Sequence, residues 1–420
     1  MDILTIRGGK SLRGEVLVEG AKNAALPEMV AALLTTEPVT LENVPNVRDI
    51  STMAALLRSF GVRVEHDAEG RRLSLRAEDL HTRRASYNLV RTMRASILTL
   101  GALLAREGRA EVSLPGGCAI GTRPINLHLE GLKKLGASVA VEHGYVHATA
   151  KRLRGAEIFF DTKTVTGTEN LMMAASLAEG TTVLQNAACE PEVSDLAEML
   201  GAMGAHIEGA GTDVLTIHGG TPLRGVEHRV VGDRIVAGTF LAAAALTRGA
   251  VRTAGVRPAH LRAFLDKLHD AGVRLEEADD AVAVRPSDDT LRARDMVTQP
   301  YPGIATDLQA QYMALMTQAH GTAVIEETIF ENRFMHVSEL LRMGADIRLD
   351  GSTAVVRGPT PLTGAHVMAT DLRASASLVL AGLAADDETV VHRVYHLDRG
   401  YERIEEKLRA LGADVERREE

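Results

Sequence analysis

The sequence contains no tryptophan, and aromatic residues make up only 3% of its 420 residues. Proteins that bind single-stranded nucleic acid stack the bases on aromatic side chains, and this chain offers few of them. Its formal net charge of −9 also argues against a nucleic-acid partner, because phosphates attract basic surfaces. A small anionic substrate remains compatible with this charge, since local arginines decide its recognition.

Cysteine and long apolar runs are scarce as well. The N-terminus lacks the basic-then-apolar layout of a signal peptide, and uncharged runs such as Ile235–Leu246 are shorter than the ~20 residues that span a bilayer. We therefore expect a cytoplasmic protein, without membrane insertion, whose two cysteines are reduced. An apolar content of 45% is ordinary for a globular protein, and the length predicts two domains.

Familiar cofactor motifs are missing. Gly9-Lys10-Ser11 matches the end of a phosphate-binding loop, but the earlier glycine that the motif requires is replaced by Leu4, and no G-x-G-x-x-G occurs. His392 and His396 are spaced like metal ligands on a helix, but the flanking apolar residues favour a strand. On a strand they would be about 13 Å apart, too far to share an ion. No metal and no cofactor are predicted.

The most informative segment runs from Pro115 to Pro124 and contains Gly116-Gly117-Cys118 and Arg123. Glycines give a loop freedom to move and let its backbone approach a ligand closely. A nearby guanidinium favours the thiolate form of a cysteine and can hold an anion. A Gly-Gly-Cys run between two prolines is poor core material, so the segment predicts a surface loop with a functional thiol.

A short pattern recurs six times along the chain. It consists of a leucine-rich helix end, a glycine, a small residue and an alternating strand, with the glycines 75, 68, 68, 72 and 68 residues apart. Each glycine is placed where a helix would end in the left-handed conformation. The six glycines are Gly61, Gly136, Gly204, Gly272, Gly344 and Gly412.

An alanine-rich segment precedes each copy and predicts a buried helix. A solenoid or propeller could have this spacing, but a unit with two helices and several strands is larger than either needs. We expect two groups of three units: residues 22–232 as an N-terminal lobe, and residues 1–21 with 233–420 as a C-terminal lobe. The predicted helices are Ala21–Leu34, Arg94–Ala105, Thr168–Ala178, Ile235–Leu246, Asp307–Gln318 and Asp371–Ala384.

Charged residues gather where these helices start. Helix N-termini present free N–H groups and attract anions, so several converging starts would bind phosphate or carboxylate. A capping or solvated role would explain any one of them, but their recurrence in both halves favours a shared site. They are Lys22 with Asn23, Arg94, Lys163, Asp307, and Asp371 with Arg373.

Several blocks in order along the chain resemble the UDP-N-acetylglucosamine 1-carboxyvinyltransferases, a family of bacterial enolpyruvyl transferases that begins peptidoglycan synthesis. This resemblance runs from about residue 2 to residue 416. It implies an α/β fold of two domains, an inside-out α/β barrel of six repeated units of about 70 residues, three per domain. The blocks are Glu19–Pro27, Thr92–Ser96, Pro115–Pro124, Thr306–Gln311, Phe330–His336, Thr370–Ser375 and Asp398–Glu402.

The resemblance implies transfer of enolpyruvate from phosphoenolpyruvate to the 3′-hydroxyl of UDP-N-acetylglucosamine. It assigns protonation of phosphoenolpyruvate to Cys118 and the base to Asp307. Lys22, Asn23, Arg123 and Arg399 match contacts to phosphoenolpyruvate, with Lys22 and Arg399 also counted as catalytic, and Arg333, Asp371 and Arg373 are supporting residues. Matches to the contacts of the nucleotide sugar are Asn23, Arg94, Arg123, Pro124, Ile125, Asn126, Leu127, Lys163, Thr164, Val165, Thr166, Asp307 and Ile329.

Two segments depart from the common family pattern. Residues 163–166 read Lys-Thr-Val-Thr where a serine–valine pair is frequent, and Asn126 replaces a frequent aspartate. Neither position touches the proton chemistry. A cysteine at position 118, where some relatives carry aspartate, predicts alkylation by the epoxide fosfomycin.

Other functions remain open at this point. The shikimate-pathway enolpyruvyl transferase shares fold and donor, but its Asn-Ala-Gly-Thr signature is missing here. A repeat scaffold or UDP-sugar sensor without turnover would be expected to lose Cys118, Asp307 or Arg399, and all three are present. A paralogue with the same activity is a further alternative. Cys189, in Ala-Ala-Cys-Glu-Pro, has no matching chemical setting and is interpreted as a structural or incidental thiol.

Overall fold

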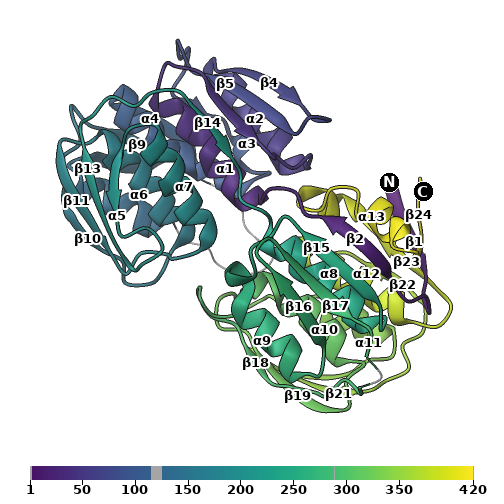
Figure 1. Cartoon of the computed structure of the whole chain (residues 1–420). Coiled ribbons are helices and arrows are strands. Elements are labelled where there is room, and N and C mark those ends of the chain that lie inside the picture. The colour runs from purple at the N-terminus through teal and green to yellow at the C-terminus, as the bar shows by residue number, and fades with distance from the viewer. Residues whose placement is uncertain (1, 115–124, 288, 420) are drawn as a thin grey trace. The chain divides into compact units, whose positions relative to one another are not determined.

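The structure is a computed structural model that describes residues 2–114, 125–287 and 289–419. The described chain forms two compact units, one of residues 20–114 and 125–231 and the other of residues 2–19 and 232–419 (Figure 1). Three four-stranded mixed sheets belong to each unit. Six repeated units in two groups of three were predicted from the spacing of the glycines, and the six sheets match that prediction.

The sheets of the unit of residues 20–231 share one pattern. Two parallel strands lie at one end of each sheet, and an antiparallel hairpin completes it. In sheet order the strands are β14 (Val226–Arg229), β3 (Val39–Glu42), β5 (Arg72–Arg76) and β4 (Arg63–Asp67); β6 (Arg84–Ala85), β7 (Arg109–Ser113), β9 (Tyr145–Thr149) and β8 (Ser138–Glu142); β10 (Glu157–Phe159), β11 (Gly180–Gln185), β13 (Val214–Gly219) and β12 (His206–Glu208).

Helices connect these strands, as parallel neighbours require a crossover. Each repeat has an alanine-rich helix before its second strand and an amphipathic helix before its hairpin. The helices are α1 (Lys22–Ala31), α2 (Arg48–Phe60), α3 (Tyr87–Val90), α4 (Thr99–Glu107), α5 (Asn126–Lys134), α6 (Val165–Leu177) and α7 (Pro191–Ala202), with the 3-10 turns η1 (Ala32–Leu34) and η2 (Arg94–Leu98).

The unit of residues 2–19 and 232–419 repeats the architecture. Its strands, in sheet order, are β16 (Arg274–Ala278), β17 (Ala281–Arg285), β15 (Ala250–Ala254) and β2 (Arg13–Leu17); β18 (Met296–Val297), β19 (Gly321–Glu326), β21 (Thr353–Gly358) and β20 (Asp346–Asp350); β22 (His366–Met368), β23 (Glu388–His392), β1 (Asp2–Arg7) and β24 (Asp414–Glu419). Its helices are α8 (Arg234–Leu246), α9 (Arg262–Asp270), α10 (Gln309–Met316), α11 (Val337–Arg342), α12 (Leu372–Ala384) and α13 (Ile404–Ala410), with the turns η3 (Pro258–Leu261), η4 (Thr306–Leu308) and η5 (Val394–Arg399).

Three strands join partners that are distant in sequence. Strand β14 pairs in parallel with β3, so the end of the first unit returns to its beginning. Strand β2 pairs with β15, and β1 lies between β23 and β24 (Figure 1, purple beside yellow). The N-terminal residues therefore belong to the unit that holds the C-terminus.

The core of each unit is helical, and the sheets lie outside it. Helices α8, α10 and α12 pack against one another, and all thirteen residues of α8 are buried. Helices α1, α4 and α6 pack together in the other unit. Alanine-rich helices suit this position because their small side chains let the backbones approach closely.

The six repeat glycines follow the ends of six helices, as predicted. Their φ angles lie between 92° and 108°, a region that favours glycine. The prediction of one strand through residues 391–397 was wrong. Strand β23 ends at His392 because Arg393 takes a positive φ of 60°, and η5 follows. Among the described residues, each helix is too short or too polar to reach across a bilayer.

Candidate active site

Asp307 lies at the start of a buried helix and is held by two arginines. It belongs to η4, which runs directly into α10. Its Oδ1 accepts a hydrogen bond from Arg333 Nη2 at 2.5 Å, and its Oδ2 accepts one from Arg373 Nη2 at 3.2 Å. Both arginine side chains are buried, whereas Asp307 keeps 24% of its side chain exposed. The carboxylate is therefore fixed by two cations, on a side chain that is only partly exposed.

These contacts set the protonation states. Burial alone would raise the pKa of Asp307, but the charges of Arg373 and Arg333 and their hydrogen bonds outweigh it and hold that pKa far below its usual range. Burial disfavours the charged form of Arg373, yet Asp307 leads the contacts that raise its pKa. Asp307 is a carboxylate and Arg373 a cation throughout the neutral range.

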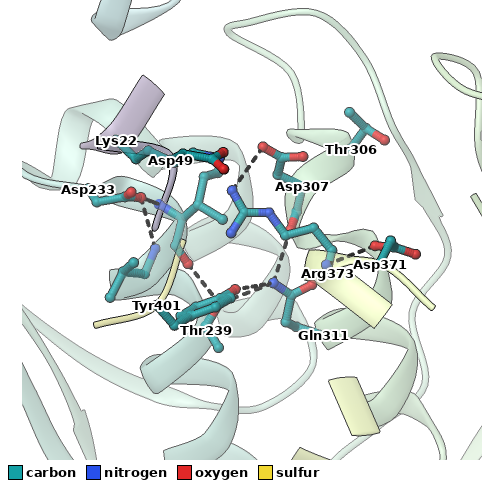
Figure 2. Close-up of polar contacts among 12 residues, drawn as sticks. Lys22, Asp49, Asp233, Thr239, Thr306, Asp307, Gln311, Asp371, Arg373 and Tyr401 are labelled. Atoms are coloured by element: carbon teal, nitrogen blue, oxygen red, sulfur yellow. Dashed lines mark hydrogen bonds and ion pairs between the residues drawn. The ribbon is translucent and has the colours of Figure 1, made fainter. Parts of the chain in front are cut away.

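Arg373 is positioned by its own helix start. Asp371 caps α12, and its Oδ1 accepts hydrogen bonds from the backbone N–H groups of Arg373 at 2.8 Å and Ala374 at 3.1 Å. The Arg373 guanidinium also lies 5.5 Å from the centre of the Tyr401 ring. Figure 2 shows Asp307, Arg373 and Asp371 side by side. The three residues predicted from two separate blocks are thus brought together.

A buried polar network supports the back of this group. Gln311 donates from Nε2 to the carbonyl of Asp307 at 2.9 Å and contacts Thr239 Oγ1 at 3.1 Å and the Tyr401 hydroxyl at 3.2 Å. Thr239 and Tyr401 are themselves 2.9 Å apart, hydroxyl to hydroxyl (Figure 2). Such networks fix a single arrangement because an unpaired buried polar atom is costly. The network therefore fixes the backbone of the turn that carries Asp307.

Glu327 organises the loop beyond the other side of Asp307. Its Oε2 accepts from the Thr306 hydroxyl at 2.8 Å, and its Oε1 accepts from Thr298 at 2.9 Å. The same Oε1 accepts from the backbone N–H groups of Ile329 at 2.9 Å and Phe330 at 3.1 Å. The amide of Ile329, a predicted contact of the nucleotide sugar, is therefore occupied, and its carbonyl and side chain are the groups left for a ligand.

In the unit of residues 20–231, Lys22 is the first residue of α1. Its Nζ lies 3.0 Å from Asp49 Oδ2, on the first turn of α2, and both side chains are largely buried (Figure 2). A lysine at a helix start adds its charge to the free N–H groups there. Asn23 follows on the same turn and is exposed. This helix start therefore supplies a cation and an amide within one turn.

His128 connects three segments predicted to bind the nucleotide sugar. It follows Leu127 directly, contacts Thr166 and lies near the charge of Arg94. Burial first, and the charge of Arg94 second, lower the pKa of His128 to about 3, so the imidazole is neutral. Asn170 Nδ2 donates to His128 Nδ1 at 2.9 Å, which leaves Nε2 to donate to Thr166 Oγ1 at 3.3 Å. Asn170 Oδ1 in turn accepts from the Gly101 N–H at 2.8 Å. The chain of hydrogen bonds orients Thr166.

The segment 163–166 precedes and starts α6. Thr164 caps this helix by accepting from the Gly167 N–H at 3.2 Å. Lys163 Nζ donates to the Ala187 carbonyl at 3.0 Å and lies 3.6 Å from Cys189 Sγ. Cys189 is buried, in line with a structural thiol, but its sulfur contacts a residue of the predicted site.

The structure thus forms two residue groups, one in each unit. The first contains Asp307, Arg333, Asp371 and Arg373, and the second contains Lys22 with Asp49, and Arg94 with His128. Ile125 is buried, while Asn126 and Leu127 begin α5 and are exposed and half-buried, respectively. Arg399 ends η5 and is half-buried. Cys118, Arg123 and Pro124 lie outside the described residues.

Sequence reasoning missed His128, Asn170, Gln311 and Glu327. His128 follows the Arg-Pro block by four residues, and Gln311 ends one of the blocks, so the sequence carried a signal for both. Asn170 and Glu327 also bond to residues remote in sequence, Gly101 and Thr298 respectively, and only the fold reveals these contacts.

Comparison with known proteins defines the class. The sequence model of the family described as EPSP synthase (3-phosphoshikimate 1-carboxyvinyltransferase) matches residues 6–408. The chain belongs to this family of enolpyruvyl transferases. The crystal structure of the enolpyruvyl transferase NikO from Streptomyces tendae has a TM-score of 0.89 and 28% identity, and the match covers 99% of this chain and 98% of that one. The predicted inside-out α/β fold is confirmed.

Two curated relatives narrow the comparison within the family. The UDP-N-acetylglucosamine 1-carboxyvinyltransferase of Magnetococcus marinus is 58% identical over 417 residues, which is 99% of each chain. The protein of the same name from Koribacter versatilis is 58% identical over 419 residues, or 99% of this chain and 96% of that one. The resemblance inferred from the sequence blocks is therefore confirmed along the whole chain.

Proposed function

We propose that this protein transfers the enolpyruvyl group of phosphoenolpyruvate to the 3′-hydroxyl of UDP-N-acetylglucosamine and releases phosphate. This is the first committed step of bacterial peptidoglycan synthesis, and it places the protein in the cytoplasm. Identity of 58% over nearly the full length to two proteins of that name supports the assignment. The structural observation that carries it is the ionised Asp307, fixed by two arginines at a helix start on a partly exposed side chain.

The reaction needs cations that stay charged beside phosphate and carboxylate. Lys22 and the N–H groups at the start of α1 supply positive potential, and Asn23 supplies an amide on the same turn. We assign Arg123 and Arg399 to the same donor substrate. Guanidinium groups suit this role because they bind phosphate and carboxylate oxygens in pairs.

Proton transfer begins at phosphoenolpyruvate. Protonation of C3 by the Cys118 thiol leaves C2 electron-poor, and the 3′-oxygen of the sugar attacks it, while the hydroxyl proton passes to Asp307. The resulting tetrahedral ketal loses phosphate and a C3 proton, and this restores the double bond. Because two arginines lower its pKa, Asp307 is a weak base, and we infer that it accepts the proton only as the new C–O bond makes the hydroxyl acidic.

The nucleotide sugar contacts a second set of residues. Arg94 and the segment 163–166 are assigned to it, with Thr166 oriented by His128 and Asn170. Arg123 to Leu127, Asn23, Asp307 and Ile329 complete this set. Arg333, Asp371 and Arg373 are positioning residues, since they fix the Asp307 carboxylate.

A runner-up function is transfer to shikimate 3-phosphate, which the description of the matching family names. The test is release of phosphate from phosphoenolpyruvate, with UDP-N-acetylglucosamine and shikimate 3-phosphate supplied as acceptors in parallel. We expect turnover with the nucleotide sugar only, and a product that is heavier by one enolpyruvyl group in mass spectrometry. Turnover with shikimate 3-phosphate alone would reverse the assignment.

A further inference from the structure

Three side chains with metal-binding atoms lie together on one sheet, and none of them is among the residues assigned above. His206 and Glu208 belong to β12, the edge strand, and His218 belongs to the neighbouring β13. His206 pairs directly with His218 across the antiparallel strands, and Glu208 lies two residues beyond His206. Side chains alternate along a strand, so all three project from the same face.

The distances suit a small ion. Glu208 Oε1 lies 3.2 Å from His206 Nε2 and 3.7 Å from His218 Nε2, and the three donor atoms are all within 4.8 Å of one another. Zinc binds nitrogen and oxygen at about 2.0–2.2 Å, which puts the donors of a tetrahedral site about 3.4 Å apart. A tetrahedral site would therefore need only a small change in the distance between the ring nitrogens of the two histidines.

We propose that His206, Glu208 and His218 bind one divalent transition-metal ion such as Zn²⁺, with water in the fourth position. Two imidazoles and one carboxylate favour zinc, nickel and copper over magnesium or calcium, which prefer oxygen ligands. The three side chains are between 40% and 66% exposed, so an ion reaches them from solvent.

A fourth residue supports the site without being a ligand. Thr181, on β11, pairs with His218 in the sheet, and its Oγ1 lies 3.1 Å from His218 Nδ1. Histidines that bind metals usually donate their second ring nitrogen to such an outer partner, which fixes the ring and leaves Nε2 as the ligand. The His206 and His218 rings are stacked with centres 4.6 Å apart, and both Nε2 atoms are directed to Glu208.

A second cluster with metal-binding atoms is less suited. His228 Nε2 lies 3.2 Å from Asp195 Oδ1 and 3.7 Å from Glu28 Oε1 in the interior of the same unit. It offers a single imidazole. Burial first, and then the charge of Asp195, raise the pKa of Glu28 well above its usual range, which makes its carboxyl group a poorer metal ligand. This cluster serves as an internal control.

The binding test uses the full-length protein without a histidine tag, freed of metal by a chelator, and titrated with Zn²⁺ in a calorimeter. We expect one equivalent to bind to the wild type. His206→Ala and His218→Ala should abolish this binding, and Thr181→Val should weaken it about tenfold, as loss of an outer partner does. Glu28→Gln should bind as the wild type does. His366→Ala removes one member of a different histidine pair, His366 and His392, and should also bind Zn²⁺ as the wild type does.

Several results would overturn the proposal. They are the absence of saturable binding by the wild type, binding of Zn²⁺ by His206→Ala or His218→Ala as tightly as by the wild type, or loss of binding in Glu28→Gln. The histidine variants keep both cysteines, so zinc held by a thiol would persist in them and count against the site. Melting curves without metal show whether each variant folds. Since no substrate is present, the result is independent of the enolpyruvyl transfer proposed above.

Discussion

Arg373 Nη2 lies 3.2 Å from Asp307 Oδ2, although the two residues are 66 positions apart in the sequence. Arg333 binds the other oxygen of Asp307, so two arginines hold the charge of this carboxylate in the candidate site. An oxyanion clamped by two guanidinium groups keeps its charge and its direction. Both properties bear on the role proposed for Asp307 as a proton acceptor.

Asp307→Asn should retain the fold and the binding of both substrates but lose turnover. An amide cannot accept the hydroxyl proton, and positioned acid–base groups contribute about 10²–10⁴-fold to rate. We expect kcat to fall by a factor in that range, measured as phosphate release. Asp289→Asn, which removes an exposed carboxylate paired with Arg274, is the matched control.

The pH profile gives a second readout of the same residue. Because the pKa of Asp307 is held far below the usual ~3.9, its ionisation should produce no limb in kcat/KM above about pH 4. Its ion pairs stabilise the fold fully above that pH and are lost only in stronger acid. A wild-type kcat in Asp307→Asn would remove this residue from the mechanism.

Glu28→Gln should stabilise the protein at high pH. Glu28 is buried on α1, where its carboxyl group lies beside Asp195 and 3.7 Å from His228 Nε2. Burial, followed by the charge of Asp195 and a hydrogen bond with it, raises the pKa of Glu28. In the unfolded chain glutamate ionises above about pH 4.3, so the folded state binds more protons and loses stability as pH rises.

Glutamine has no such loss, since it ionises in neither state. We expect the difference in melting temperature between Glu28→Gln and wild type to grow from about pH 5 to about pH 8. Glu227→Gln, an exposed position on β14, should show no such growth. A difference that shrinks with rising pH would mean that Glu28 is ionised in the folded protein.

Much of what was predicted from the sequence depends only on residues that are neighbours along the chain. The six glycines end helices because each needs a positive φ, and this requirement depends on neighbouring residues only. The positions of Lys22 and Asp371 at helix starts follow from the same local reasoning. A local signal also misled: Val394 and Leu397 suggested a strand, but the backbone of Arg393 ends it.

Contacts between remote segments could not be predicted from one sequence. Strand β14 pairs with β3, and Arg333 and Arg373 bind Asp307, but the separation of these residues in the sequence follows no recognisable pattern. Glu28 did leave a signal, because it is the only charged residue in the apolar run from Ala24 to Leu34. A charge inside a helix that is otherwise buried indicates a partner or a proton.

Asn170→Ala should weaken both folding and sugar binding. It leaves two buried groups, the Gly101 N–H and His128 Nδ1, without their partner. Each such group costs about 1–3 kcal/mol of unfolding free energy. We expect a lower urea midpoint, and a KM that rises for UDP-N-acetylglucosamine more than for phosphoenolpyruvate, because Thr166 loses its orientation.

The exposed Asn88→Ala serves as the control for this change and should alter neither quantity. Equal increases in both KM values would instead indicate a general loss of structure. Unchanged stability would show that another group, or water, replaces the Asn170 side chain.

Alanine substitutions at two glycines near the end of α7 distinguish the effect of backbone strain from that of helix propensity. A Cβ at Gly201 or at Gly204 meets nothing within 4 Å, but only Gly204 has a positive φ, of 108°. Gly204→Ala should therefore cost about 1–2 kcal/mol through backbone strain. Gly201→Ala, inside the helix, should stabilise by about 0.5–1 kcal/mol. Urea unfolding measures both, and a stabilising Gly204→Ala would contradict the assigned backbone.

Fosfomycin should alkylate one of the two cysteines only. Cys189 is 9% exposed, and its sulfur lies against Lys163 Nζ and the Ala187 carbonyl, so an epoxide has little access to it. We expect peptide mass spectrometry to find the adduct on Cys118. Cys118→Ser should react with no fosfomycin and should lose turnover, since a hydroxyl is a far weaker proton donor than a thiol. Cys189→Ser is the matched control and should keep both alkylation and activity. An adduct on Cys189, or full activity in Cys118→Ser at neutral pH, would refute the assignment of the reactive thiol.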